Sequence, residues 1–392
     1  MKFLHLADLH LGKQLSGFSL IDDQRFALEN LLSDAVERNV DALILAGDIY
    51  DKSVPSAEAT SLLDWFLTEA AARKLKVFAV PGNHDSAERV AYASDLIAHL
   101  GVHIPAVYNG SIERATFEDD HGVVNLWLIP FLKPAHVRPY FPDADIGQDY
   151  TAALRTALDS IELDAAQRNI AIAHQFVTSA GSEPQRSNSE LNIGGLDNVD
   201  ASVFDAFDYV ALGHIHRGQR TGRDTVRYAG SLLKYSASEA AGDKSAVLVD
   251  VGPKTDEVPG SCISFELMPL RPLHDLRAIR GPLEQITAPA VIGAADADDY
   301  LAVTLTDEQA PLDALARLRA AYPNIISLDY DNERTRHAAQ GAPSRLVDDD
   351  FDPFELFARF YKEQNGMDLD DDQRRLVAET LALVCDPERN DR

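Results

Sequence analysis

Residues 43–51, LILAGDIYD, mark the carboxyl end of a buried strand. Residues 43–46 are apolar and have the length and branching of a strand that is buried on both faces. The run stops at Gly47 and Asp48, so a carboxylate follows the strand at the edge where open α/β sheets bind ligands. An isolated Gly-Asp pair is more often a turn or a helix N-cap. Because other strands of this chain end in the same way, we interpret Asp48 as a carboxylate shared by two metal ions.

The sequence around this stretch alternates short apolar runs with helical patterns. We expect strands at residues 3–7, 41–46, 76–80, 102–107, 123–129, 170–173 and 209–212, and helices at 22–38, 56–75, 87–100 and 150–161. Ser56 is the expected N-cap of the second helix. Residues 226–251 have the pattern of short strands separated by turns, which suits a second sheet layered on the first. The pattern predicts an α/β fold.

Side chains with oxygen or nitrogen ligand atoms recur directly after these apolar runs. They are Asp8, His10, Asp48, Asn83, His84, Asp85, His174, His214 and His216. Five of the twelve histidines occupy such positions, whereas random placement would scatter them over helices and loops. Residues two apart, as in DLH and HIH, point to the same side of an extended backbone and can address one metal cluster. Imidazole, carboxylate and amide oxygen together form a ligand set for Mn²⁺, Fe²⁺ or Zn²⁺ rather than for Mg²⁺ alone.

Two residues near this pattern have simpler interpretations. His5 lies within the first strand, and we expect it to be a packed histidine rather than a ligand. Asn83 follows Pro81 and Gly82 and could be a turn residue, but His84 comes directly after it and favours a ligand.

Composition limits the classes of protein to consider. A chain of 392 residues predicts two domains and an appendage, and a net charge of −27 argues against binding nucleic acid by bulk charge alone. The two cysteines are far apart, so no disulfide framework or thiolate zinc site is readable. Neither a signal peptide nor a membrane span is apparent. We expect a cytoplasmic protein that does not associate with a membrane.

The motifs carry a resemblance to a known family. The series DLH, GDIYD, GNHD, AHQ and GHIH resembles the five signature motifs of the calcineurin-like metallophosphoesterases in order, strand context and approximate spacing. Beyond them, HLADLHLG, VPGNHDS, WLIPFLKP and FDYVALGHIH resemble the bacterial SbcD nuclease subunits, relatives of the Mre-type recombination nucleases. The resemblance implies a two-sheet β-sandwich flanked by helices, with a small α+β capping domain and a C-terminal helical hairpin.

The resemblance also implies a role for each site residue. One metal ion would be held by Asp8, His10, Asp48 and His216, and the other by Asp48, Asn83, His174 and His214. His84 would sit over the scissile phosphate and assist departure of the leaving oxygen, with Asp85 orienting it. The expected cofactors are two divalent ions, Mn²⁺ foremost, which support in-line displacement without a covalent protein nucleophile. At Asp51 some archaeal and eukaryotic members carry a histidine that contacts the substrate phosphate.

The chain divides by composition into four segments. We expect a metallophosphoesterase nuclease domain at 1–252, a capping domain at 253–331, a linker at 332–347 and a C-terminal helix pair at 348–392. The expected elements of the capping domain are strands at 261–269, 273–280, 300–305 and 325–329, and helices at 281–288 and 311–322. The resemblance implies that the capping domain restricts which DNA conformations reach the site.

The two final helices are amphipathic. The apolar residues along them are Phe354, Leu356, Phe357, Phe360, Tyr361, Leu376, Val377, Leu381, Leu383 and Val384. Acidic residues near each helix start suit the helix dipole. The resemblance implies that this pair grips the coiled-coil base of an SbcC-type ATPase. The alternative is that both helices pack on their own domain.

Basic residues cluster after the last motif. The segment 216–235 contains five basic residues and only one acid, Asp224. The basic residues are Arg217, Arg220, Arg223, Arg227 and Lys234, and they could form a basic rim that binds DNA phosphates. A solvated loop is the alternative. The polar loop at 178–195, which contains Arg186, could contact substrate or simply connect two elements.

Two function classes remain open from residues alone. The resemblance implies a DNA exonuclease and endonuclease acting on double-stranded ends and hairpins, within an SbcCD-type complex for DNA replication, recombination and repair. The alternative is a metallophosphoesterase acting on cyclic nucleotides, other small phosphoesters or phosphoproteins. No nucleotide-binding P-loop motif occurs in the sequence, so ATP dependence would require a partner.

The helices at 56–75 and 87–100 carry more large apolar residues than one face against a sheet needs. These residues are Leu62, Leu63, Trp65, Phe66, Leu67, Tyr92, Leu96 and Ile97. Since this region pairs two subunits in the family, we expect a homodimer.

Overall fold

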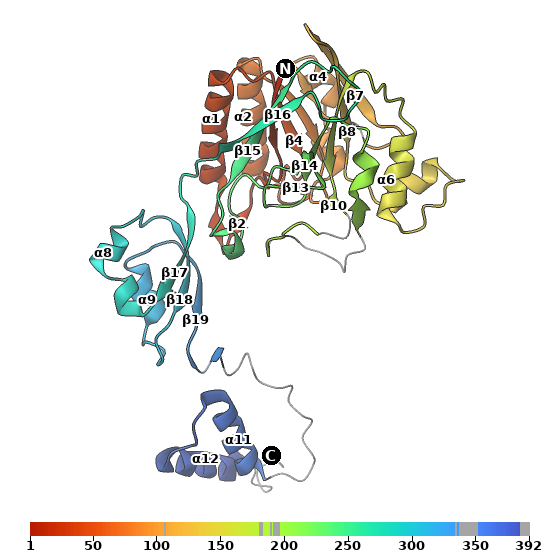
Figure 1. Cartoon of the computed structure of the whole chain (residues 1–392). Coiled ribbons are helices and arrows are strands. Elements are labelled where there is room, and N and C mark those ends of the chain that lie inside the picture. Colours follow the sequence, from red (N-terminus) through yellow and green to blue (C-terminus); the bar gives the residue numbers. More distant parts are fainter. Residues whose placement is uncertain are drawn as a thin grey trace. The chain divides into compact units, whose positions relative to one another are not determined.

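The computed structural model describes residues 1–105, 107–179, 183–188, 190, 197–333, 335–336 and 352–384. The chain forms two compact units, Met1–Arg277 and Ala278–Arg392. Figure 1 shows the first unit as sheets covered by helices, and the second as a small sheet with helices followed by the C-terminal helix pair.

One sheet of the first unit has the strand order β16-β15-β1-β4-β5-β6. Its strands are β1 (Lys2–Leu6), β4 (Ala42–Ala46), β5 (Lys76–Val80), β6 (Val102–His103), β15 (Ser245–Val251) and β16 (Ile263–Pro269). Strands β1, β4, β5 and β6 are parallel, while β15 is antiparallel to β1 and β16 is antiparallel to β15. All five residues of β4 are buried, as the apolar run predicts for a central parallel strand.

The second sheet has the order β13-β14-β12-β9-β8-β7. Its strands are β7 (Glu113–Asp119), β8 (Gly122–Ile129), β9 (Arg168–His174), β12 (Tyr209–Gly213), β13 (Gln219–Thr221) and β14 (Arg223–Tyr228). Ile44 and Phe78 of the first sheet share one buried cluster with Leu126, Ile172 and Tyr209 of the second. The two sheets therefore pack face to face as a β-sandwich, and each fully buried large side chain between them contributes about 1.5–3 kcal/mol.

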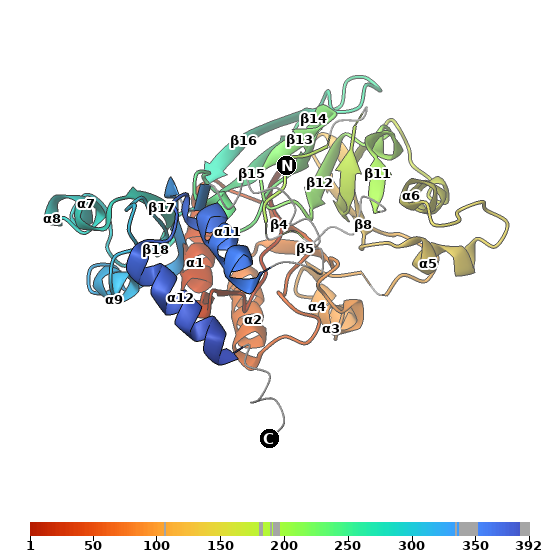
Figure 2. The same ribbon diagram turned by 90° about the horizontal axis from the view of Figure 1, so that it is seen from below.

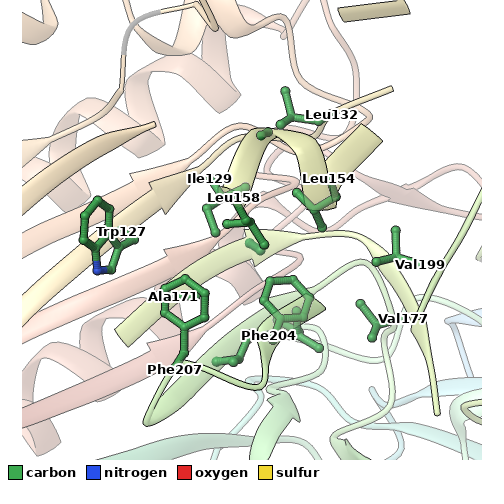
Figure 3. Close-up of a cluster of buried hydrophobic side chains, with 14 of the residues drawn as sticks. Trp127, Ile129, Leu132, Leu154, Leu158, Ala171, Val177, Val199, Phe204 and Phe207 are labelled. Carbon is green, nitrogen blue, oxygen red and sulfur yellow. The ribbon is translucent and has the colours of Figure 1, made fainter. Parts of the chain in front are cut away.

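Helices cover both outer faces of the sandwich. α1 (Ile21–Glu37) and α2 (Ala57–Ala72) lie beside the first sheet, and α6 (Tyr150–Asp159) lies on the opposite side (Figures 1 and 2). The side chain of Ser56 accepts a hydrogen bond from Ala59 N at 3.2 Å, which confirms it as the N-cap of α2. In Figure 3, Leu154 and Leu158 of α6 lie among the apolar side chains of the second sheet.

Short elements connect these layers. They are β2 (Gln14–Leu15), β3 (Phe18–Ser19), α3 (Ala87–Val90), α4 (Ser94–Ala98), α5 (Pro134–Val137), η1 (Arg138–Tyr140), β10 (Phe176–Thr178), β11 (Asn198–Asp200), η2 (Ala201–Phe204) and η3 (Ala237–Glu239). The expected single helix at 87–100 is wrong, because Ala93 takes a left-handed φ of 59° and divides it into α3 and α4.

The second unit has a three-stranded sheet of β17 (Leu276–Gly281), β18 (Tyr300–Leu305) and β19 (Ile325–Tyr330) in that order. The helices packed with it are α7 (Leu283–Ile286), α8 (Pro289–Ile292) and α9 (Ala314–Arg319). Its own core joins Leu283, Leu301, Val303, Leu318 and Tyr322.

The tail contains α11 (Pro353–Asn365) and α12 (Asp371–Val384), so the expected helix pair is present. Asp352 caps α11 by accepting from Phe354 N at 3.1 Å. At the start of α12, Asp370 accepts from Gln373 N at 2.8 Å and Gln373 accepts from Asp370 N at 3.0 Å, a capping box. Gln373 also donates to the Tyr361 hydroxyl at 3.1 Å and joins the two helices.

The predicted α/β sandwich is confirmed, but the boundary predicted at residue 252 is wrong. That boundary places β16 in the capping domain, yet this strand pairs with β15 along its whole length and extends the first sheet. The compact units divide after Arg277 instead. Most of the linker predicted at 332–347 lies outside the described residues. Within the described ranges, every helix is too short or too polar to span a lipid bilayer.

Candidate active site

Five parallel strands of the two sheets end at one edge of the sandwich. Asp8 follows β1, Asp48 follows β4 and Asn83 follows β5, while His174 ends β9 and His214 follows β12. Hydrogen bonds join the two sheets at this edge. The N–H of His214 donates to Asp8 Oδ1 at 3.0 Å, and His174 Nδ1 donates to the Ala46 carbonyl at 2.9 Å. The structure thus brings together residues that lie far apart in the sequence.

Backbone strain concentrates in the turns that follow these strands. Asp8, His10, Asp48 and His214 have φ values of 50°, 44°, 47° and 101°, in the region that side-chain-bearing residues rarely adopt. Such conformations persist where the surrounding structure holds them, and they cluster at functional sites. Gly47 also has a positive φ, and a Cβ there would lie 2.2 Å from His174 Nδ1. Only glycine allows the β4 turn to pass so close to this imidazole.

The first group of candidate ligands comprises Asp8, His10 and His216, whose ligand atoms all lie within 4.8 Å of one another. The three side chains are buried. His10 Nε2 lies 3.0 Å from His216 Nε2 and 3.7 Å from Asp48 Oδ2. Two imidazole nitrogens that face each other so closely need a proton or a cation between them.

The second group comprises Asp8, Asp48 and His174, again with ligand atoms within 4.8 Å of one another. Asp48 Oδ2 lies 3.4 Å from His174 Nε2. Asn83 Oδ1 lies 2.9 Å from both His174 Nε2 and His214 Nδ1. Because His174 Nδ1 donates to the Ala46 carbonyl, its Nε2 faces two acceptor oxygens, and this arrangement requires either a proton or a metal cation at Nε2.

Asp8 is a member of both groups. Asp48 belongs to the second group and also to a third, with His10 and His84. Its Oδ2 atom lies within 3.7 Å of His10 on one side and 3.4 Å of His174 on the other, and its Oδ1 accepts the N–H of His84 at 2.9 Å. The donor set therefore fits two divalent cations that share one carboxylate, with oxygen and imidazole ligands suited to Mn²⁺, Fe²⁺ or Zn²⁺.

The electrostatics of the cluster follow from burial and close approach. Burial raises the pKa of the Asp8 carboxyl to about 6. Burial also acts to raise the pKa of Asp48, but the adjacent His174 and His10 outweigh it and hold that pKa well below its usual range. Burial lowers the pKa of His10 well below its usual value and that of His214 to about 3, so both imidazoles are neutral at neutral pH and can act as ligands.

His84 stands beside the cluster with a partly exposed side chain. Its Nδ1 lies 3.0 Å from the backbone carbonyl of Asp51, so the imidazole is oriented by an N–H donated to that oxygen. The rings of His84 and His10 meet edge to face with centroids 4.9 Å apart. The opposite nitrogen, Nε2, is left to receive or donate a proton at the site.

The expected role of Asp85 in orienting His84 is wrong. The Asp85 carboxylate accepts hydrogen bonds from the backbone N–H groups of Ile49, Tyr50 and Gly82, at 3.0, 2.9 and 2.9 Å. It is turned toward these amides because the PGNHD turn crosses the GDIYD turn there. Asp85 thus fixes the position of one strand-end turn against another and acts on His84 only through the backbone.

Asp51 and Glu239 complete the surroundings of the imidazoles. Asp51 Oδ1 accepts from Lys13 Nζ at 2.7 Å and lies 3.6 Å from His10 Nδ1. Glu239 Oε1 lies 3.7 Å from His216 Nδ1, and Lys244 donates to Glu239 Oε2 at 2.5 Å. The sequence did not predict Glu239 because no motif marks it, and only folding brings it to His216. As predicted, His5 is packed in the core, with its Nδ1 3.0 Å from the Tyr209 hydroxyl.

The expected substrate-binding arginines fall into different environments. Arg223 is half-buried and donates to the carbonyls of Phe204, at 3.1 Å, and Phe207, so its predicted role in substrate binding is wrong. Arg220 is exposed and paired with Asp224 at 2.7 Å, and Arg217 is exposed. The guanidinium of Arg186 stacks 3.8 Å from the Phe176 ring centroid. Much of the predicted 178–195 loop, residues 180–182, 189 and 191–195, lies outside the described residues.

Comparison with known proteins agrees with this geometry. Residues 1–218 match the family model described as calcineurin-like phosphoesterase, and residues 272–365 match one described as type 5 capsule protein repressor C-terminal domain. The chain is 29% identical over 391 residues to the SbcD component of nuclease SbcCD from Staphylococcus epidermidis, a match that covers 99% of this chain and 100% of that protein. The resemblance drawn from the motifs is therefore confirmed.

Two solved structures are also similar. A dimetal phosphatase from Danio rerio is 14% identical, with a TM-score of 0.37, and the match covers 64% of this chain and 92% of that one. The protein TT1561 of Thermus thermophilus is 14% identical, with a TM-score of 0.39, and the match covers 68% of this chain and 98% of that one. These scores are too low to support an argument about the site.

We predict that Asp48→Ala weakens Mn²⁺ binding at both positions, because the Asp48 carboxylate lies between His10 of one group and His174 of the other. The loss should exceed the roughly 10- to 100-fold change typical of residues that only support a ligand. His84→Gln should bind as many Mn²⁺ ions as the unaltered chain, and so should His121→Gln, a control at an exposed histidine outside the site. Titration calorimetry and metal analysis measure both quantities. Loss of Mn²⁺ from His84→Gln to the same extent as from Asp48→Ala would contradict the assignment.

Proposed function

The chain belongs to the calcineurin-like phosphoesterase family, and on that premise we propose that it is a metal-dependent DNA nuclease. It hydrolyses phosphodiester bonds at double-stranded ends and hairpins, as the nuclease subunit of an SbcCD-type complex in DNA replication, recombination and repair. The observation that carries the chemistry is the buried Asp48 carboxylate between His10 and His174. The similarity to the SbcD component of nuclease SbcCD along nearly the whole chain supports DNA as the substrate.

Two Mn²⁺ ions are the proposed cofactors. Asp8, His10, Asp48 and His216 would hold one ion, and Asp48, Asn83, His174 and His214 the other. Two such ions supply charge neutralisation at the phosphate and a lowered pKa for the attacking water. The chain itself holds the ligand imidazoles in position through Ala46 and Glu239, which set the direction in which each ring faces.

His84 is the proposed catalytic residue. With its Nδ1 held by the Asp51 carbonyl, the ring can present Nε2 to the leaving oxygen of the phosphodiester and donate a proton to it. The backbone N–H of His84 also binds Asp48, so the turn that carries the acid is tied to the proposed metal bridge. Asp85 is a positioning residue, since it holds this turn through backbone amides.

The C-terminal helix pair is the proposed binding segment for an SbcC-type coiled-coil ATPase. Phe357 and Phe360 of α11 are 40% and 58% exposed, and Leu376 of α12 is 64% exposed. Large apolar side chains left on the surface of a short helix pair are typical of helices that bind in a partner's groove.

A homodimer is the proposed assembly, and its surface differs from the one expected. Leu62, Leu63 and Phe66 of α2 are buried inside the first unit and cannot form an interface. Tyr92, Leu96 and Leu100, in and around α4, are 82%, 71% and 68% exposed. These three side chains support a dimer surface at residues 92–100, and Trp65 and Leu67 of α2 are partly exposed.

We predict that the purified chain cleaves DNA with Mn²⁺ and is inactive after chelation. Double-stranded DNA, single-stranded DNA, a cyclic nucleotide and a phosphopeptide should be compared under identical metal conditions. His84→Gln should lower DNA cleavage by about 100-fold or more, within the range for general acids, while Mn²⁺ binding is retained. Turnover of only the cyclic nucleotide and the phosphopeptide would favour the alternative phosphoesterase function and reject the nuclease.

We predict that the double substitution Phe357→Glu and Phe360→Glu abolishes co-purification with the cognate SbcC-type ATPase, because it places charge on the apolar helix face. Mn²⁺-dependent cleavage of a simple DNA substrate should persist. Leu312→Glu is the matched control, since Leu312 is 85% exposed but lies outside the tail. ATPase binding equal to that of the unaltered chain would remove the tail's assigned role.

We predict a dimer by light scattering at micromolar concentration, and a monomer for the double substitution Tyr92→Glu and Leu96→Glu. Both residues are exposed, so the substitutions should not lower the thermal stability of the monomer appreciably. An unaltered chain that is monomeric under these conditions counts against the proposed assembly.

A further inference from the structure

A cavity of about 500 Å³ lies beside the candidate metal centre. Its wall nearest the centre is formed by Asn83, and its remaining wall carries the aromatic residues Tyr108, Phe131 and Tyr140 together with Lys133. These residues come from the turn after β5, the segment after β6 and the region from the end of β8 through η1. Neither the proposed metal binding nor the proposed assemblies require a group to be bound in this cavity.

The cavity and the metal centre share a wall. Asn83 Oδ1 lies 2.9 Å from both His174 Nε2 and His214 Nδ1, so this residue faces the centre while its turn lines the cavity. The Phe131 ring is nearly parallel to the His214 ring, at 14°, with centroids 6.5 Å apart. A group bound in the cavity would therefore be close to a phosphate bound at the metal centre.

Packing holds the aromatic rings of the cavity wall in fixed positions. The rings of Tyr108 and Tyr140 meet edge to face with centroids 5.7 Å apart. Gly110 has a φ of +97°, and a Cβ on it would lie 2.8 Å from the Tyr140 ring, so glycine lets that ring lie flat against the backbone. Tyr140 nevertheless remains 47% exposed. A large ring held in place while still exposed is suited to stacking on a ligand.

The cavity also offers polar groups. The Tyr108 hydroxyl is buried and has no hydrogen-bond partner among the described residues. Burial raises the pKa of Tyr108 to about 12, so the hydroxyl keeps its proton at neutral pH. The Lys133 ammonium lies 5.7 Å from the Phe131 ring centroid and is exposed. Of the two acids lining the cavity, Glu88 accepts from the Ser86 hydroxyl at 2.8 Å and Asp85 is turned toward backbone amides.

We propose that this cavity receives the nucleobase next to the scissile phosphate of the DNA substrate. The inference rests on the proposed nuclease function. A base is joined to its phosphate through a single sugar, so a phosphate at the metal centre places the adjacent base within reach of Phe131 and Tyr140. Every base has an aromatic face, and stacking on protein rings is therefore tolerant of sequence. Lys133 would contact a flanking phosphate.

The test compares cleavage of matched oligonucleotides in which a stable abasic residue replaces each nucleotide in turn. For the unaltered chain, an abasic residue should slow cleavage at one adjoining phosphate by about 5- to 150-fold, since stacking is worth about 1–3 kcal/mol per base. In Tyr140→Ala and Phe131→Leu this difference should shrink to less than about 2-fold, because cleavage beside a normal residue should fall more than cleavage at the abasic position. Tyr140→Phe, which keeps the ring, should behave as the unaltered chain does.

The outcomes separate this inference from the function on which it rests. If the unaltered chain cleaves no DNA, the nuclease function fails and the inference fails with it. If it cleaves DNA at equal rates beside normal and abasic residues, the inference alone is overturned, whatever the variants do. Equal losses on both kinds of substrate in Tyr140→Ala and Phe131→Leu would likewise overturn it. Thermal melting and Mn²⁺ titration of each variant identify any that has lost its fold or its metal centre.

Discussion

The structure of the site depends on the cost of burying the Asp48 carboxylate. A buried charge is tolerated only when it is paired and hydrogen-bonded. Asp48 Oδ1 is bound by the N–H of His84, and Oδ2 lies between His10 and His174. These three partners come from the ends of β1, β5 and β9, and Asp48 itself follows β4, so the sandwich must align the carboxyl ends of four strands from two sheets at one edge. The packing of the core between the sheets thereby determines the geometry of the candidate metal centre.

Carboxylates around this centre hold turns and rings rather than bind substrate. Asp85 joins the turn after β5 to the turn after β4, and Asp51 pairs with Lys13 beside His10. Glu239, neutralised by Lys244, faces His216. Each contact limits the movement of a candidate ligand, and ligands held in advance need less reorganisation when metal or substrate binds. The turns that carry the candidate ligands have positive φ angles, so the fold holds strained backbone conformations at the positions where these side chains converge.

The net negative charge of the chain means that the proposed binding of DNA cannot rest on the overall charge of the protein. The chain carries a net charge of −27, and several basic residues after the last motif serve the fold. Arg223 binds backbone carbonyls, Arg227 stacks on Phe265, and Lys234 pairs with Asp275. Arg217 and Arg220 remain exposed near the site. The proposed affinity for DNA therefore rests on local groups. One of them is the aromatic cavity next to the metal centre, where stacking of a base on uncharged rings does not depend on the net charge of the protein.

The sequence by itself determined the α/β pattern and the identity of the candidate ligands. These were readable because each ligand directly follows an apolar run, and strand ends are a local property of the chain. Tertiary structure alone decided where side chains turn: Asp85 toward backbone amides, Arg223 into the protein, and Glu239 toward His216. It also decided that β16 extends the first sheet. Such contacts join residues far apart in sequence, and no local pattern encodes them, because they arise only when packing of the two sheets brings the residues together.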